Sequence, residues 1–425
     1  MIRVTRDSLD KIRNRALAYY CLRYVQMEEQ FAKAVSDHGL SFGEFNSSED
    51  LHKSVSSVSE NNRKSYCTGE MSVACKNCKT GEGATTFVLT LACNRDCYFC
   101  TNKNQIDYDE LQECYNDVVA EFDEFAKSQT VKSVALTGGE PLLLPEICEE
   151  FYTHVKSFNK SIHTRLYTNG DLVTEKIMER LTPYLDEIRV GIKWEEDETI
   201  NLEEAAKVLS LCSRFDIDVV IEMPVLPGGY EEMVKLIEVA EDKGVSSINV
   251  LEYLFAWNHA EDYSAKEYKI KNPSYKVPYA YDYAGGLPVD GSEKEALKLI
   301  EYCMDKDLKC AVHYCSLENK LSSQIFHQNR DYKPMPYELL SCDDYFIKSL
   351  KVFGGDIAKA KSVLDSSSYT VDGDMMEVHP SESESLFKVG IDEILLCHSV
   401  VEDFEGRRVI REAWVDMLEQ EDKVK

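Results

Sequence analysis

Basic residues are scarce in this chain of 425 residues. Its 48 lysines and arginines stand against 76 aspartates and glutamates, which gives a net charge of −28 at pH 7. Nucleic-acid backbones and anionic membranes are bound largely through positive protein charge. The charge balance therefore disfavours nucleic acid and membrane as partners of this protein.

We expect the protein to show no salt-sensitive binding to DNA or RNA near physiological ionic strength. Counterion release drives non-specific binding and needs lysines or arginines against the phosphates, and the acidic chain offers few of them. Titration of labelled random RNA at about 150 mM salt checks this expectation, and a micromolar affinity there would contradict it.

Long apolar runs are also missing. No run approaches the roughly 20 residues of a helix that spans a bilayer, and the opening stretch MIRVTRDSLDKIRNR has no apolar secretory segment. The sequence shows no internal repeat and no low-complexity tract. These absences predict a cytoplasmic protein, whose fifteen cysteines are expected to be metal ligands or core residues rather than disulfides.

From Thr85 onward, segments typical of strands alternate with segments typical of helices. The predicted strands are 85–91, 133–137, 163–168, 187–194, 218–225 and 247–254, with amphipathic helices near 173–182, 202–215 and 230–243. Repeated βα units predict parallel strands with right-handed crossovers. Six units predict an α/β fold, a partial (β/α)6 barrel whose chemistry lies at the carboxyl ends of the strands.

The rest of the chain is predicted to flank this barrel. One long helix at 5–38 precedes it, an irregular insertion rich in Tyr, Asp, Gly and Pro follows its sixth strand, and alternating segments near the end predict short strands. The predicted divisions are 1–66 for an N-terminal helical segment and linker, 67–84 for a CxxC segment, 85–315 for the barrel with its insertion at 255–291, and 316–425 for a small, mostly β C-terminal module.

Three cysteines follow the first predicted strand within LTLACNRDCYFCTNK: Cys93, Cys97 and Cys100. Three thiolates are too few to close a tetrahedral structural metal site. They suffice to hold three irons of a four-iron cluster and to leave one iron open for a ligand. Taken alone, the same three residues could also bind zinc with a fourth ligand, or be reduced thiols.

A second motif, GGEP, follows the second predicted strand and comprises Gly138, Gly139, Glu140 and Pro141. Two glycines let the backbone approach a ligand closely. The glutamate can accept a hydrogen bond from an ammonium group, or it can be a solvated turn carboxylate. The carboxyl ends of neighbouring parallel strands should bring GGEP beside the cysteines.

The spacing Cys93-x3-Cys97-x2-Cys100, with Phe99 before the last cysteine and GGEP downstream, resembles the radical S-adenosylmethionine (SAM) superfamily over roughly residues 85–254. The resemblance implies that the three cysteines hold a [4Fe–4S] cluster and that the amine and carboxylate of SAM chelate the fourth iron. It also implies that GGEP binds the methionyl amine. An electron from the cluster, supplied by a donor such as flavodoxin or ferredoxin, would cleave SAM to a 5′-deoxyadenosyl radical.

Four further residues are candidates for contact with SAM or substrate. Thr168 and Asn169 end the third predicted strand, although an Asn-Gly turn there needs no ligand. Lys193 and Glu222 are polar residues within the otherwise apolar fourth and fifth strands. They indicate either a polar cavity or an ion pair between neighbouring strands.

A CxxC pair, Cys75 and Cys78, precedes the first strand and is a common half-site for zinc or an iron–sulfur cluster. Cys315 is the expected partner, with Cys67 and Cys342 as further candidates. The pair should lie at the opposite end of the barrel from the first cysteines, since a strand of seven residues covers about 23 Å. For Cys315 to join it, either the segment after Cys78 folds back or the strand at 309–314 runs antiparallel.

These motifs favour an enzyme that cleaves SAM reductively and abstracts hydrogen from an unknown substrate, a small molecule or a peptide. The run from Cys75 to Cys100, with LPVDGSE (287–293) and HYCSLENKLSSQ (313–324), is similar to an uncharacterised group related to the pyruvate formate-lyase activating enzyme. An activating enzyme of a glycyl-radical protein is therefore one alternative. A non-catalytic metal–thiolate sensor or maturation scaffold is an alternative from another class.

Overall fold

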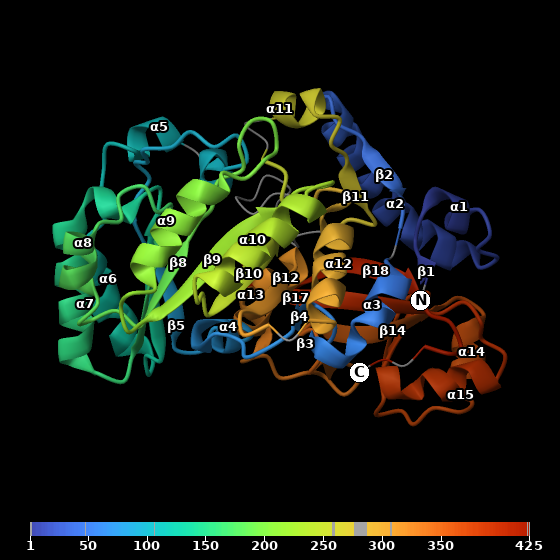
Figure 1. Cartoon of the computed structure of the whole chain (residues 1–425). Coiled ribbons are helices and arrows are strands. Elements are labelled where there is room, and N and C mark those ends of the chain that lie inside the picture. Colours follow the sequence, from blue (N-terminus) through green and yellow to red (C-terminus); the bar gives the residue numbers. More distant parts are fainter. Residues whose placement is uncertain are drawn as a thin grey trace. The chain divides into compact units, whose positions relative to one another are not determined.

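The structure, a computed structural model, describes residues 2–46, 48–105, 107–256, 260–275, 287–306, 308–422 and 424 (Figure 1). The chain divides into two compact units. The larger unit is His38–Ser323, and the smaller unit combines Met1–Asp37 with Gln324–Lys425.

The larger unit is built on a nine-stranded sheet of described residues, in the order β3-β4-β12-β10-β9-β8-β7-β6-β5. The strands are β3 (Ser59–Glu60), β4 (Ser65–Cys67), β5 (Ala84–Thr90), β6 (Ser133–Gly138), β7 (His163–Thr168), β8 (Glu187–Val190), β9 (Asp218–Val225), β10 (Ser247–Glu252) and β12 (Ala311–Cys315). Strands β5 to β10 and β12 run parallel, and β4 pairs antiparallel with β12. This open parallel sheet confirms the predicted partial barrel and adds β12 as a seventh parallel strand.

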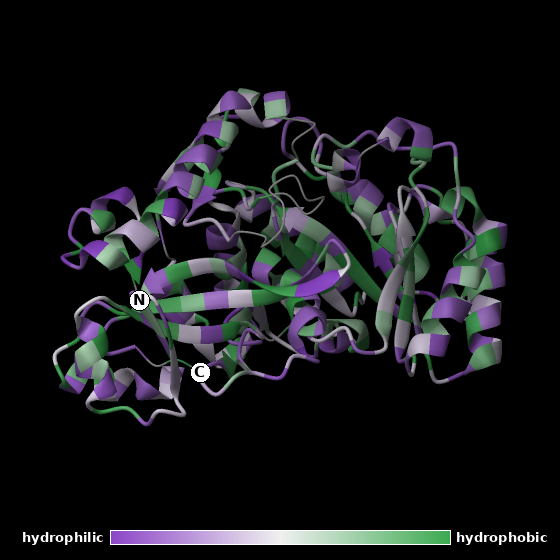
Figure 2. Cartoon of the chain, turned by 180° about the vertical axis from the view of Figure 1, so that it is seen from behind, coloured by the Kyte–Doolittle hydropathy of each residue, from purple (hydrophilic) through white to green (hydrophobic). Residues whose placement is uncertain are grey.

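Helices follow the strands and cover the sheet (Figure 1). They are α3 (Glu49–Ser54), α4 (Val73–Cys78), α5 (Tyr108–Leu111), α6 (Val118–Ser128), α7 (Pro145–Phe158), α8 (Glu175–Leu181), α9 (Leu202–Cys212), α10 (Tyr230–Asp242), α12 (Ser292–Met304) and α13 (Leu317–Asn329). Each long helix buries one apolar stripe, as α10 does with Met233, Leu236, Ile237 and Ala240. In Figure 2 the parallel strands are accordingly mostly hydrophobic, whereas the helices mix hydrophobic and hydrophilic residues. None of the helices within the described ranges has the length and apolar character needed to cross a membrane.

The predicted insertion at 255–291 lies partly outside the described residues. Its described part contains the short helix α11 (Ala260–Ala265) and the strand β11 (Ile270–Asn272). Strand β11 pairs with β2 (Phe42–Phe45) in a separate two-stranded sheet.

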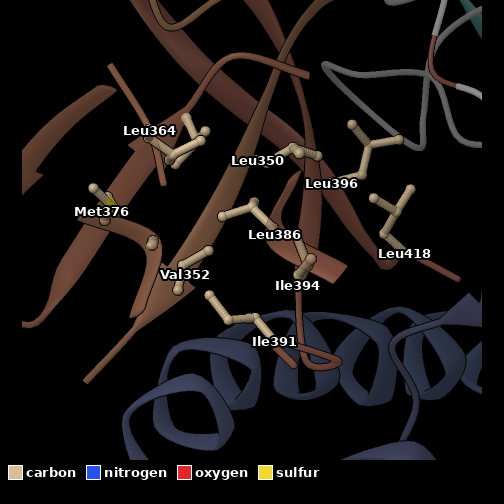
Figure 3. Packing of buried hydrophobic residues seen from close by; sticks show 11 residues of the cluster. Leu350, Val352, Leu364, Met376, Leu386, Ile391, Ile394, Leu396 and Leu418 are labelled. Atoms are coloured by element: carbon tan, nitrogen blue, oxygen red, sulfur yellow. The ribbon is translucent and has the colours of Figure 1, made fainter. Parts of the chain in front are cut away.

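The smaller unit is an antiparallel sheet in the order β1-β18-β17-β14-β16-β15, with β13 paired to β14. Its strands are β1 (Ile2–Arg3), β13 (Leu339–Leu340), β14 (Ile347–Phe353), β15 (Tyr369–Asp372), β16 (Met375–Val378), β17 (Leu395–Phe404) and β18 (Arg407–Met417). Alternate residues of each strand point to opposite faces. On one face Leu350, Val352 and Leu396 pack with residues of α14 (Asp356–Lys361) and α15 (Ser383–Lys388), as Figure 3 shows.

The opposite face of this sheet is covered by the long N-terminal helix α2 (Arg15–Asp37), whose Leu17 and Cys21 pack with Leu395 and Cys397. The prediction of one helix at 5–38 was wrong. The segment forms α1 (Arg6–Leu9) and then α2, because the Asn14 side chain accepts hydrogen bonds from the first backbone N–H groups of α2 and starts a new helix.

The predicted four-part division into 1–66, 67–84, 85–315 and 316–425 stays a prediction. The compact units group the chain differently, because the N-terminal helix buries its apolar stripe on strands from the other end of the sequence. Periodicity along a sequence identifies such a stripe but not the element that covers it.

Candidate functional site

The loop after β5 places the three predicted cysteines, Cys93, Cys97 and Cys100, on the wall of one cavity of about 330 Å³ at the carboxyl ends of the strands. All three thiols are half-buried. The loop is held by the Cys100 backbone N–H, which donates to the Cys97 carbonyl at 3.2 Å, and by the Arg95 N–H, which donates to Cys93 Sγ at 3.4 Å. The sequence-predicted triad is thus gathered at the predicted end of the sheet.

Gly138 and Gly139 line the same cavity, at the end of β6. The Gly139 N–H donates to the Thr90 carbonyl at 2.7 Å, which ties the motif to the end of β5. A Cβ on Gly138 would lie 2.0 Å from the Thr90 oxygen, and a Cβ on Gly139 would lie 2.1 Å from the Ala92 oxygen. Both glycines are therefore required by backbone packing, while Pro141 is buried in the following turn.

Glu140 is fully buried, with 0% of its surface exposed. Its carboxylate accepts hydrogen bonds from Leu142 N at 2.9 Å, from Thr168 Oγ1 at 2.9 Å and from Asn169 N at 2.6 Å. Burial raises the pKa of this carboxyl group, and these three donors oppose the rise. The alternative of a solvated turn carboxylate is therefore wrong, because Glu140 joins the end of β6 to the end of β7.

Thr168 and Asn169 both line the cavity as well. The Asn169 side chain donates to Asn94 Oδ1 at 2.7 Å and lies 3.7 Å from Cys93 Sγ, and its Oδ1 accepts from Asp171 N at 3.0 Å. The two residues thus shape the turn and also face the cysteine loop. Contact of either residue with SAM stays a prediction.

Lys193 lies beyond β8, which ends at Val190, so its predicted place inside a strand was wrong. Its ammonium pairs with Glu195 at 2.7 Å, while Glu222 on β9 pairs with Arg189 on β8. The proposed ion pair between Lys193 and Glu222 is therefore absent from the described residues. Both side chains nevertheless line the cavity, beside apolar residues such as Ile192 and Met223.

Sequence reasoning missed several lining residues, among them the charged residues Arg189 and Lys320. Arg189 is buried and donates to Glu187 at 2.5 Å as well as to Glu222. An arginine within a strand of apolar residues carries the same signal that singled out Glu222, so it could have been found. Lys320 is an exposed residue on α13, and nothing in the sequence distinguishes it from other surface lysines.

The CxxC pair lies on the short helix α4, which Figure 1 shows at the end of the barrel opposite α5. Strand β12 runs parallel to β10, so the antiparallel route for Cys315 is excluded. Cys75 and Cys78 are nevertheless close enough for their charges to act on Cys315. The structure thus brings the three predicted ligands into one neighbourhood, with Cys75 half-buried, Cys78 exposed and Cys315 buried.

The two groups of thiols differ in their electrostatics. Burial and then the neighbouring Cys100 raise the pKa of Cys97 to about 11. Burial also raises the pKa of Cys75, but the Arg189 guanidinium and His313 outweigh it and lower the value to about 6. Arg189 Nη2 donates to Cys75 Sγ at 3.0 Å, which stabilises a thiolate there.

Among the described residues, no three His, Cys, Asp or Glu side chains converge on one metal ion. A four-iron cluster does not require this convergence, because each cysteine binds a different iron. The donor set of three half-buried thiols around one cavity, beside two glycines with no side chains, fits such a cluster with SAM against it.

Comparison with known proteins places this site in a family. The protein-family model described as the "Radical SAM superfamily" matches residues 87–240. A Methanocaldococcus jannaschii protein, provisionally named a glycyl-radical enzyme activating enzyme, is 30% identical over 295 residues, which cover 66% of this chain and 74% of the relative. A GTP 3′,8-cyclase of Helicobacter pylori is 33% identical over 107 residues, which cover 24% of this chain and 32% of that protein.

Solved structures are more distant. The structure of Streptococcus suis SuiB bound to S-adenosylmethionine aligns with a TM-score of 0.41 at 15% identity. The alignment covers 58% of this chain and 54% of the SuiB chain. The structure of anSMEcpe with bound AdoMet and the Cp18Cys peptide aligns with a TM-score of 0.33 at 16% identity. The alignment covers 40% of this chain and 51% of the anSMEcpe chain. On the family model and the M. jannaschii relative, the chain belongs to the radical SAM superfamily and is a radical SAM enzyme.

Proposed function

We propose that the protein binds a [4Fe–4S] cluster through Cys93, Cys97 and Cys100 and uses it to act on SAM and a second substrate. The supporting observation is that these three thiols and the backbone of Gly138 and Gly139 line a single cavity. When bound, the cluster and SAM supply reductive cleavage of SAM to a 5′-deoxyadenosyl radical, which abstracts hydrogen from the substrate.

The chain's own residues position these groups. The Asn169 amide and the Arg95 N–H surround the Cys93 sulfur, and N–H groups near a thiolate stabilise its negative charge. The Arg95 guanidinium is in turn fixed by Asp171, to which its Nε donates at 2.8 Å. These contacts hold the cysteine loop in place before any ligand binds.

The cavity wall is largely apolar but carries four charged side chains. Arg189 pairs with the partly buried Glu222, and Lys193 and Lys320 add two ammonium groups. These charged side chains would bind polar groups of the substrate through hydrogen bonds and ion pairs. The bond that is formed, and whether SAM is consumed or regenerated, depend on that substrate.

We expect anaerobically reconstituted protein to form 5′-deoxyadenosine from SAM when dithionite supplies electrons. Chromatography with mass detection measures the product, and protein without iron is the matched control. A fully loaded cluster that gives no 5′-deoxyadenosine would favour the non-catalytic sensor or scaffold instead.

A second candidate is activation of a glycyl-radical protein, and the name of the M. jannaschii relative supports it. Such an enzyme would receive a loop of a protein partner rather than a small molecule. A flavodoxin or a ferredoxin would supply the electron in either case, in the cytoplasm. A glycyl radical seen by electron paramagnetic resonance (EPR) in a co-expressed partner would distinguish this function from action on a small molecule.

A further inference from the structure

A second group of thiols comes from two segments far apart in the sequence, helix α4 and strand β12. Cys75 and Cys78 project from α4, and Cys315 ends β12. Cys315 and His313 lie two residues apart on one strand, so their side chains share a face. Cys75 neighbours His313, and the charges of Cys75 and Cys78 act on Cys315, so the three thiols and the imidazole lie in one neighbourhood.

His313 is a buried imidazole that neighbours the Cys75 thiol. Only 4% of its surface is exposed, and apart from its approach to Cys75 neither ring nitrogen has a hydrogen-bond partner among the described residues. Burying polar groups without partners costs free energy, and such groups are rare in native structures. A neutral imidazole is a common metal ligand, so a metal at this position would satisfy the orphaned nitrogen.

Polar side chains on the neighbouring strands surround this group. In register across four strands, Cys67, His313, Asn249 and Glu222 form one row. Asn249 Nδ2 donates to Glu222 at 2.7 Å, but Asn249 Oδ1 has no partner among the described residues. Partners of this kind orient the ligands of metal sites and tune them.

Arg189 connects this row to the first site. Its guanidinium donates to Cys75 Sγ at 3.0 Å, pairs with Glu222 and lines the cavity of Cys93, Cys97 and Cys100. A buried cation compensates the negative charge that several thiolates bring to a metal centre. Arg189 therefore contacts one group of cysteines and lines the cavity of the other.

We propose that Cys75, Cys78, Cys315 and His313 bind a second iron–sulfur cluster. A single zinc ion would need its ligands to converge at about 2.0–2.3 Å from one point, and no three such side chains converge in the described part of the chain. A cluster binds each ligand to a different iron, so it fits a spread set of donors. This centre does not depend on the proposed reaction at the first site.

The test compares wild-type protein with the Cys75→Ala, Cys78→Ala double variant after anaerobic reconstitution. We expect about eight irons per chain in the wild type and about four in the double variant, measured by elemental analysis. We also expect dithionite-reduced wild type to show two EPR components, of which the double variant loses one. The remaining component should still change on addition of SAM. Cys114→Ala, which removes an exposed cysteine that is not a candidate ligand, should retain all of the iron.

Two further measurements keep the proposal falsifiable if the double variant folds poorly. A wild type with only about four irons and one EPR component would overturn it, as would one zinc per chain in place of the second iron. His313→Ala should alter only the second component. The Cys93→Ala, Cys97→Ala, Cys100→Ala variant should keep about four irons while losing 5′-deoxyadenosine formation, so failure of the proposed function and failure of this centre give different results.

Discussion

Replacement of Cys97 with alanine is expected to abolish 5′-deoxyadenosine formation. With only Cys93 and Cys100 remaining, one iron of a four-iron cluster would lose its protein ligand. Cys93, Cys97 and Cys100 all lie half-buried on the cavity wall, and no fourth cysteine lines this cavity among the described residues. No neighbouring thiol can therefore replace the lost ligand without movement of the loop.

The expected loss is measured in single-turnover assays with reconstituted protein, together with the iron content and the absorbance of the cluster. Cys114→Ala is the matched control, because Cys114 is exposed, follows the same loop and does not line the cavity. It should keep the wild-type rate. Wild-type activity in the Cys97→Ala variant, or in a variant lacking all three thiols, would show that the cluster is held elsewhere.

The barrel could be predicted from the sequence because its signals are local. Each strand from 85–91 to 247–254 is a short apolar run beside an amphipathic helix, and parallel βα units allow few arrangements. Cys93, Cys97 and Cys100 follow the first of these strands, so the topology alone places them at the carboxyl ends of the strands, where the active site of such a barrel lies. The strand predicted at 187–194 ended early at Val190, because periodicity does not mark where pairing with a neighbour stops.

The strands of the C-terminal module were predicted, but the way the smaller unit assembles could not be, since its contacts are non-local. Strand β1 pairs with β18 and α2 packs on Cys397 and Leu395, although nearly the whole chain separates these segments. The helix α4 illustrates the same limit. Its CxxC motif was evident, but the approach of Cys75 to Arg189 and His313 depends on how a short helix folds against the sheet.

Glu140 shows why a motif residue can be identified correctly while its role stays open. The sequence predicted a carboxylate facing an ammonium group. In the structure the side chain is fully buried, and it does not line the cavity that Gly138 and Gly139 line. Its three hydrogen bonds run to Leu142, Thr168 and Asn169 instead.

We therefore expect Glu140→Ala to destabilise the fold as well as to weaken SAM binding. The substitution leaves two backbone N–H groups and the Thr168 hydroxyl without their acceptor, and each unsatisfied buried group costs about 1–3 kcal/mol. The free energy of unfolding of the apoprotein should fall by about 3 kcal/mol or more. Urea unfolding followed by circular dichroism measures this change. Glu146→Ala is the matched control, because it removes an equal charge from an exposed carboxylate that pairs with Arg180, and it should leave stability nearly unchanged.

The effect on SAM follows from the same contacts. Asn169 N is held by Glu140 while the Asn169 side chain lies 3.7 Å from Cys93 Sγ, so loss of the carboxylate frees the turn that faces the cysteine loop. We expect SAM affinity to fall about ten-fold or more, as for the loss of about 1.5–3 kcal/mol, with the iron content of the first cluster retained. Equilibrium dialysis with labelled SAM measures this affinity. A normal stability with weakened SAM binding would mean that Glu140 turns outward to touch SAM directly, and a normal affinity with reduced stability would remove Glu140 from the binding site altogether.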